Sequence, residues 1–176
     1  MKTIREQIIE RIITELENIT PANGYHNNIG IGHVYRQESV IEKNLIPAVS
    51  VWEMSESRER NKYGGTVRVL IVKVEAIVQV NGNKQAATIS NELLADMETA
   101  LIIGGEGANL DELIDDIQDI AAEIALMPTD HELYSELSNS TPDIVPLPIE
   151  RKLAGASIDF EITYTTAWGD PYSVSQ

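Results

Sequence analysis

Residues 66–80 read TVRVLIVKVEAIVQV, and this stretch decides the fold. Apolar residues occupy alternate positions throughout, which is typical of a β-strand whose side chains point to two faces in turn. One parity stays apolar to the end, whereas the other begins apolar and turns polar at Lys73, Glu75 and Gln79. We therefore predict a long central strand, buried on both faces at its start and on one face at its end.

Extended segments are predicted on both sides of this strand. Residues 47–54, PAVSVWEM, alternate in the same way, and the polar run 55–65 that follows is predicted to form a hairpin-like loop. Residues 25–44 are predicted to hold a short extended piece followed by a loop. Near the C-terminus, residues 156–165 predict a one-sided strand, with apolar positions at Ile158, Phe160, Ile162 and Tyr164.

Three segments have the spacing of amphipathic helices. Residues 4–16 carry one apolar stripe, and Thr3 followed by Glu6 has the spacing of a capping box, so a helix is predicted to begin there. Residues 84–102 predict a second helix. Residues 110–127 predict a third, because their apolar residues recur at intervals of three and four: Leu110, Leu113, Ile114, Ile117, Ala121 and Ile124.

These elements indicate an α+β fold, a small, largely antiparallel (mixed) sheet with helices packed on one face. A chain of 176 residues is long enough for one sizeable core, so residues 1–176 are expected to form a single domain. Residues 128–148 contain four prolines among polar residues, and we expect them to make an excursion over the surface.

The composition excludes several classes of protein. Asp and Glu number 28 against 13 Lys and Arg, which gives a formal net charge of −15 and a surface that phosphate backbones repel. The chain has no cysteine, which excludes disulfides and thiolate metal sites. Its N-terminus is charged every few residues, unlike a signal peptide, and no stretch approaches the roughly 20 apolar residues of a membrane helix. We expect a soluble protein without specific nucleic-acid or membrane binding.

The sequence offers few groups for catalysis. His26, His33 and His131 do not stand at metal-ligand spacings, and the acidic run 111–119 lacks the alternating oxygen ligands and central glycine of a calcium loop. The glycine-rich residues 102–110, IIGGEGANL, lack the lysine of a phosphate-binding loop and are interpreted as a turn between helices. We expect no enzyme, no cofactor and no metal.

Several segments together resemble the small tail-completion proteins of long-tailed bacteriophages, especially the tail terminator family. The closing aromatic strand that runs into a Gly-Asp-Pro-Tyr turn is the most suggestive of them. The segments are MKTIREQIIERIITEL (1–16), LIPAVSVWE (45–53), TVRVLIVKVEAIVQV (66–80), ISNELLADMETAL (89–101) and FEITYTTAWGDPYS (160–173).

The resemblance implies a non-enzymatic ring, a hexamer, that caps the finished tail tube of a phage or prophage and helps to join tail to head. Its partners would be the tail tube and the neck or head-completion proteins, in a virion assembled in the bacterial host cytoplasm. Residues 128–148 and the helical pattern before them depart from the family's smaller pattern, which leaves a neck or head-completion protein open. Outside phage assembly, a small protein-binding adaptor domain is the main alternative, and an enzyme is the third.

The resemblance also suggests where such a protein would contact its partners. Candidate interface segments are the loop after the strand 47–54, the region 128–148 and the C-terminal tail. The residues singled out in the loop and the tail are Arg58, Arg60, Tyr63, Trp168 and Tyr172.

Overall fold

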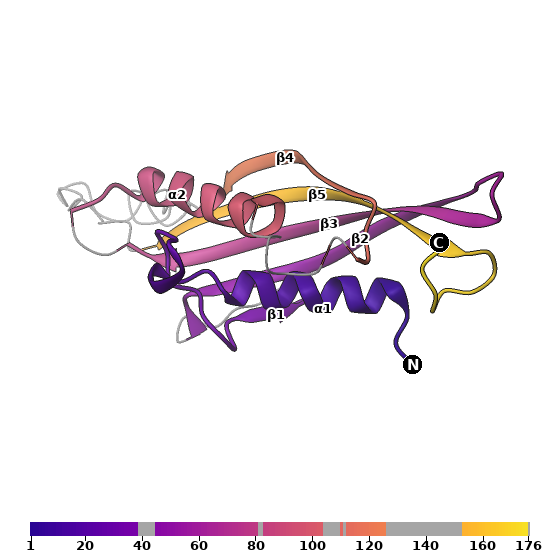
Figure 1. Ribbon diagram of the computed structural model, residues 1–176. Helices are drawn as coiled ribbons and strands as arrows, with labels where there is room; N and C mark the ends of the chain where they lie inside the picture. Colours follow the sequence, from indigo (N-terminus) through magenta and orange to yellow (C-terminus); the bar gives the residue numbers. More distant parts are fainter. Residues whose placement is uncertain (39–44, 81–82, 104–109, 111, 126–152, 176) are drawn as a thin grey trace, which may run out of the picture.

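In the computed structural model, five strands form one mixed sheet in the order β1-β2-β3-β5-β4, and two helices pack against it (Figure 1). The predicted α+β class is confirmed. The structure describes residues 1–38, 45–80, 83–103, 110, 112–125 and 153–175. The strands are β1 Val34–Arg36, β2 Ala48–Arg60, β3 Gly65–Gln79, β4 Asp116–Ala125 and β5 Leu153–Ala167.

Strand β3 lies at the centre of the sheet, as predicted. It pairs antiparallel with β5 along its whole length, from Gly65 opposite Ala167 to Gln79 opposite Leu153, and antiparallel with β2 on its other side. Only one parity of its side chains is buried in the core. The expected burial of both faces at its start is wrong, because Val67 and its neighbours on that parity stay partly exposed and no described element covers that face.

Strand β2 is longer than predicted, because the run expected to form a loop continues in the ladder to Arg60 opposite Thr66. A bulge lies between Glu53, opposite Val72, and Glu56, opposite Leu70. Residues three apart in a regular strand point to opposite faces, but the extra residue of the bulge turns Glu53 and Glu56 to the same, helix-covered face.

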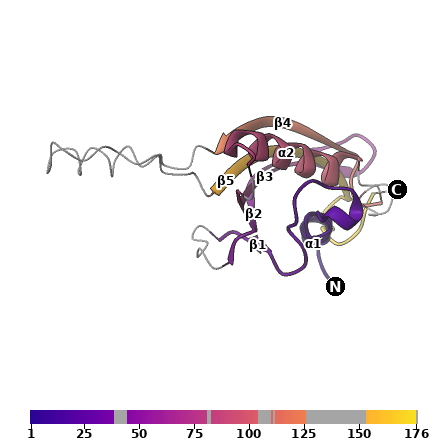
Figure 2. The same ribbon diagram turned by 90° about the vertical axis from the view of Figure 1, so that its left-hand side faces the viewer.

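Both helices cover one face of the sheet (Figure 2), and the side chains that point to this face are buried from Leu70 to Val78 in β3 and from Ala154 to Thr166 in β5. Helix α1, Ile4–Glu17, begins as predicted: the Thr3 hydroxyl accepts a hydrogen bond from the Glu6 amide at 3.2 Å. The Glu6 side chain binds Arg36 and not the Thr3 amide expected in a capping box. Helix α2, Ala86–Glu98, confirms the second helix and continues into a π-helical turn, Thr99–Ile103.

The third predicted helix is wrong, because residues 116–125 form the edge strand β4. A second bulge explains the misleading pattern. Asp119 lies opposite Phe160 and Ala121 opposite Asp159, so Ile120 is an extra residue. The bulge changes the parity of the strand, so that Ile117 and Ile124, seven residues apart, both lie opposite apolar positions of β5. A bulged strand thus mimics helical spacing.

The predicted excursion at residues 128–148, His131 and most of the glycine-rich turn lie outside the described residues. In the ranges that the structure describes, no helix has the length and apolar character needed to cross a membrane.

Burial of alternate side chains in β5 leads to a first prediction. Phe160 is fully buried in the core, whereas Glu161 lies on the uncovered face. We expect Phe160→Ala to lower the free energy of unfolding by roughly 3–5 kcal/mol, from lost burial and the cavity left behind. Glu161→Ala is the matched control and should change it by no more than about 0.5 kcal/mol. If urea unfolding shows that the two variants lose the same free energy of unfolding, this placement of the core is wrong.

Candidate functional site

The β2–β3 hairpin ends in a well-defined turn beyond the helices (Figure 1). The Asn61 side-chain oxygen accepts hydrogen bonds from the Tyr63 amide at 3.0 Å and the Gly65 amide at 2.8 Å. Gly64 has a φ of 90°, a left-handed conformation that favours glycine. We call residues 58–64, together with the chain end 168–175 that packs on them, the hairpin tip.

Backbone hydrogen bonds fasten the chain end to this hairpin. The Trp168 amide donates to the Gly64 carbonyl at 3.1 Å, and the Ala167 amide donates to the Ser173 carbonyl at 2.9 Å. The Ile4 amide at the start of α1 donates to the Pro171 carbonyl at 2.9 Å. The start of α1 is therefore bonded to the chain end, and the chain end is bonded to the hairpin.

The hairpin tip presents aromatic and basic side chains to solvent. The Arg60 guanidinium lies 3.8 Å from the centre of the Trp168 ring, a cation–π contact that joins strand to tail. Tyr63 is 82% exposed and Trp168 62% exposed, and Tyr172 is also exposed. The structure thus brings four of the five residues singled out in the sequence to one end of the molecule.

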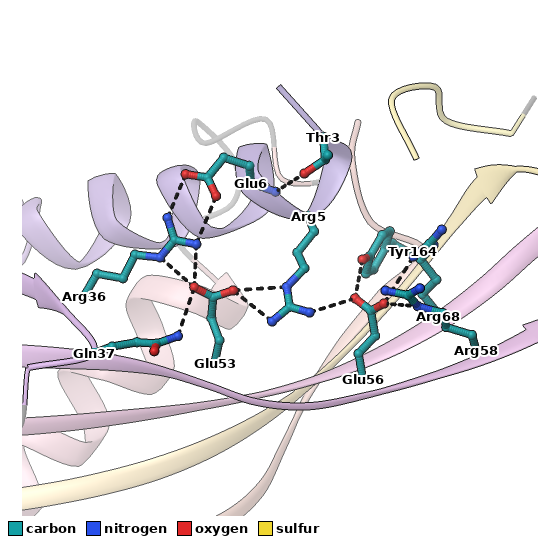
Figure 3. A network of polar contacts seen from close by, with 10 residues as sticks. All are labelled: Thr3, Arg5, Glu6, Arg36, Gln37, Glu53, Glu56, Arg58, Arg68 and Tyr164. Carbon is teal, nitrogen blue, oxygen red and sulfur yellow. Dashed lines mark hydrogen bonds and ion pairs between the residues drawn. The ribbon is translucent and has the colours of Figure 1, made fainter. Parts of the chain in front are cut away.

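The fifth, Arg58, lies at the base of the hairpin tip and belongs to a network of ion pairs (Figure 3). Glu56, whose side chain is 4% exposed, is the centre of this end of the network. It accepts hydrogen bonds from the Tyr164 hydroxyl at 2.6 Å, from Arg58 Nε at 2.5 Å and from Arg68 Nη1 at 3.2 Å. Arg68 Nε also donates to the Thr166 hydroxyl at 3.1 Å.

Arg5 of α1 connects Glu56 to the second carboxylate, Glu53. Its guanidinium lies 2.9 Å from Glu53 Oε2 and 3.5 Å from Glu56 Oε2. Arg36 of β1 donates to Glu53 Oε1 at 2.6 Å and binds both oxygens of Glu6 at 2.7 and 2.9 Å. The network therefore joins α1, β1, β2, β3 and β5.

Opposing effects set the ionisation of this network. Burial alone raises the pKa of Glu56, but hydrogen bonds from Tyr164 and Arg58 and the charges of Arg58 and Arg5 outweigh burial and lower it. Burial and the adjacent Glu56 carboxylate raise the pKa of the Tyr164 hydroxyl, which stays protonated as a donor. Glu56 is consequently an anion at neutral pH, and its role here is to hold guanidinium groups in place.

Sequence reasoning missed this network, although one signal was present. Glu53, Glu56 and Arg68 occupy positions that face the core, where charge is costly unless it is paired. Without the bulge in β2, alternation places only one of the two glutamates on that face, and Arg5 looks like part of the solvated side of α1. The pairing becomes visible only when the register is known.

The two histidines that the structure describes, His26 and His33, make local structural contacts. Asp96 of α2, which is buried, accepts hydrogen bonds from the backbone amides of His26 and Asn27 at 3.0 and 2.8 Å. His33 Nδ1 lies 2.7 Å from the Pro47 carbonyl. Across the described part of the chain, no three His, Asp or Glu side chains are close enough together to hold a metal ion.

The described part of the acidic run, residues 112–119, lies on strand β4 and in the segment just before it, and Asp111 lies outside the described residues. Glu112, Asp115, Asp116 and Asp119 are all exposed, on or just before β4. The helix predicted over residues 110–127 would place these carboxylates on a helix surface, which is wrong because the element is a strand. Asp115 accepts a hydrogen bond from the Thr165 hydroxyl at 2.5 Å.

A second prediction concerns Glu56. Replacing it with Gln leaves the guanidinium groups of Arg58 and Arg68 beside a neutral side chain. We expect the free energy of unfolding to fall by about 3 kcal/mol, the lower end of the range for breaking a buried pair, because Arg58 is largely solvated. Glu59→Gln, at an exposed position in the same strand, is the control and should be nearly neutral. Equal urea midpoints for the two variants would show that the network contributes nothing measurable.

A third prediction follows from the lowered pKa of Glu56. A carboxyl group whose pKa is lower in the folded than in the unfolded chain adds stability that is complete above its unfolded value of about 4.5 and is lost as the pH falls through its folded value. The gap in unfolding free energy between the native chain and Glu56→Gln should therefore narrow below about pH 4.5. Glu15, whose pKa burial raises, acts in the opposite direction, but it is common to both proteins and cancels in the difference. A gap that is constant from pH 7 to pH 3 would contradict this assignment.

Comparison with protein-family models gave no match, and comparison with curated protein sequences gave none either.

Proposed function

We propose that this chain is a non-enzymatic tail-completion protein of a bacteriophage or prophage, of the tail terminator type. It forms a hexameric ring that caps the tail tube and helps to join tail to head, and it assembles in the bacterial host cytoplasm. The observation that carries the proposal is the hairpin tip, a rigid projection with exposed aromatic side chains at the end of the molecule.

The chemistry of the hairpin tip supports a role in protein contacts. Trp, Tyr and Arg are the residues that most often dominate the binding energy of protein interfaces. Here Arg60, Tyr63 and Trp168 occur together on one small surface. Exposed aromatic side chains gathered in this way are typical of a surface that binds another protein. Their gathering depends on the register of β2, β3 and β5.

The rigidity of the hairpin tip supports the same role. Its turn is closed by Asn61, and the chain end is tied to it by backbone hydrogen bonds. At its base, Arg58 and Arg68 are held by Glu56, which also binds α1 through Arg5. A surface that is already ordered loses less conformational entropy on binding, so more of its contact energy appears as affinity.

The proposed mechanism is occupancy. A ring whose symmetry matches the tube covers the growing end, while its other face cannot add a tube subunit and is free to meet neck proteins. No bond is made or broken. The net charge of −15 suits a lumen through which DNA passes without adhering.

A fourth prediction tests this function by solution mass. Light scattering over a concentration series, at low and moderate salt, should give the mass of six subunits, because the exposed aromatic residues of the hairpin tip become buried between copies. Trp168→Ala should shift the chain toward the monomer. Ile31→Ala, which removes an exposed apolar side chain far along the sequence from the tip, is the control and should leave the mass unchanged.

Some rings assemble only on their template, so the same proteins should also be added to tail tubes of the encoding phage and imaged. A ring at one end of the tube, lost in Trp168→Ala and kept in Ile31→Ala, is the expected result. A chain that stays monomeric and leaves every tube end bare contradicts the proposed function and favours an adaptor domain.

A further inference from the structure

Charge is distributed unevenly over this acidic chain. In the hairpin tip, residues 58–62 carry three cations, Arg58, Arg60 and Lys62, and one anion, Glu59, and the chain end 168–175 adds a second anion, Asp170. Residues 112–123, on the far edge of the sheet, carry no cation and five anions. These are Glu112, Asp115, Asp116, Asp119 and Glu123, all of them exposed.

Strand β4 has the features of an edge strand that can pair with another chain. It is the last strand in the sheet order and pairs with β5 alone among the described strands. Most of its described side chains are exposed, including Ile120 at 50% and, to a lesser extent, Ile124, whereas Ile117 is half-buried against the core. A ten-residue edge strand with exposed apolar residues is a template for contact with another chain.

The hairpin tip reaches beyond the edge of β4. The ladder between β4 and β5 begins with Asp116 opposite Thr163, whereas β3 continues along β5 to Gly65 opposite Ala167. Four residues of strand correspond to about 13 Å. Figure 1 shows the hairpin extending past α1 and β4, so it projects from this end of the molecule.

We propose that the hairpin tip of one copy docks on the β4 edge of the next copy. Arg60 and Lys62 lie against Asp116 and Asp119, and the exposed aromatic rings cover Ile120. This inference deepens the proposed function and rests on it, since it specifies how copies of the ring contact one another.

The complementary charges favour a second copy as the occupant. Two surfaces on the same chain, one basic and aromatic, the other acidic and apolar, are matched, while the net charge of −15 makes any less specific approach of two copies repulsive. Because the two surfaces are different, the contact is head-to-tail. Such contacts close into a ring when the rotation between copies allows it.

A fifth prediction tests the contact by charge reversal. The tip-reversed variant carries Arg60→Glu and Lys62→Glu, and the edge-reversed variant carries Asp116→Lys and Asp119→Lys. Each variant alone should self-associate at least about tenfold more weakly than the native chain, because like charges then face each other. An equimolar mixture should assemble again, with the two variants alternating around the ring. Restored assembly also shows that both variants are folded.

The matched control is Lys2→Glu with Arg11→Glu, which alters the net charge as much as tip reversal does but lies on or beside α1. Its assembly should equal that of the native chain. All proteins are measured by light scattering, and on tail tubes if the native chain is monomeric in solution.

The outcomes separate the two proposals. If native chains form rings and both reversed variants still form them, or if the mixture fails to recover, the contact is overturned while the ring-forming function stands. If the tip-reversed variant fails to assemble but the edge-reversed variant assembles normally, the tip contacts an acidic surface other than β4. That outcome also overturns the proposed contact. A native chain that never assembles, in solution or on tubes, overturns the function itself.

Discussion

The antiparallel pairing of β3 with β5, fifteen residues on each strand, is the constraint on which the rest of the structure depends. Its register puts one parity of both strands on a single face, and that face is what the helices bury. The paired strands are longer than the part of the sheet that the helices cover. The sheet therefore continues past the apolar core, and the side chains on the helix-covered face beyond it cannot all pack against apolar residues.

The ion-pair network is how the chain solves this problem. Where the apolar core ends, the core-facing positions of β2, β3 and β5 become Glu56, Arg68 and Tyr164, and α1 contributes Arg5. A buried ion pair seldom stabilises a fold more than well-packed apolar residues of the same size, because desolvation offsets its attraction. What it supplies is geometry: a carboxylate that binds several donors fixes their directions, here those at the base of a projecting hairpin.

The sequence predicted the parts of the fold in which one period holds without interruption. Strands β3 and β5 and helices α1 and α2 were found because each keeps a constant spacing over many residues. The end of β2 and the whole of β4 were missed, and the cause is the same in both: one extra residue at Met54–Ser55 and another at Ile120 reverse the parity of the strand. A bulge cannot be recognised from periodicity alone, because the extra residue is defined only by the pairing with the partner strand. The residues of the hairpin tip were named from the sequence, but their proximity depends on that same register.

The two bulges also shape the surfaces that we propose to meet between copies. The bulge in β2 turns Glu56 inward, beneath the hairpin, where it can hold Arg58 and Arg68 while Arg60 remains free to stack on Trp168. The bulge in β4 leaves Ile120 without a partner in the ladder and half exposed among carboxylates. A regular strand in either place would bury one side chain and expose the next in strict alternation. If copies meet as proposed, the two bulges that make the sequence hard to interpret also shape the two surfaces of the ring interface.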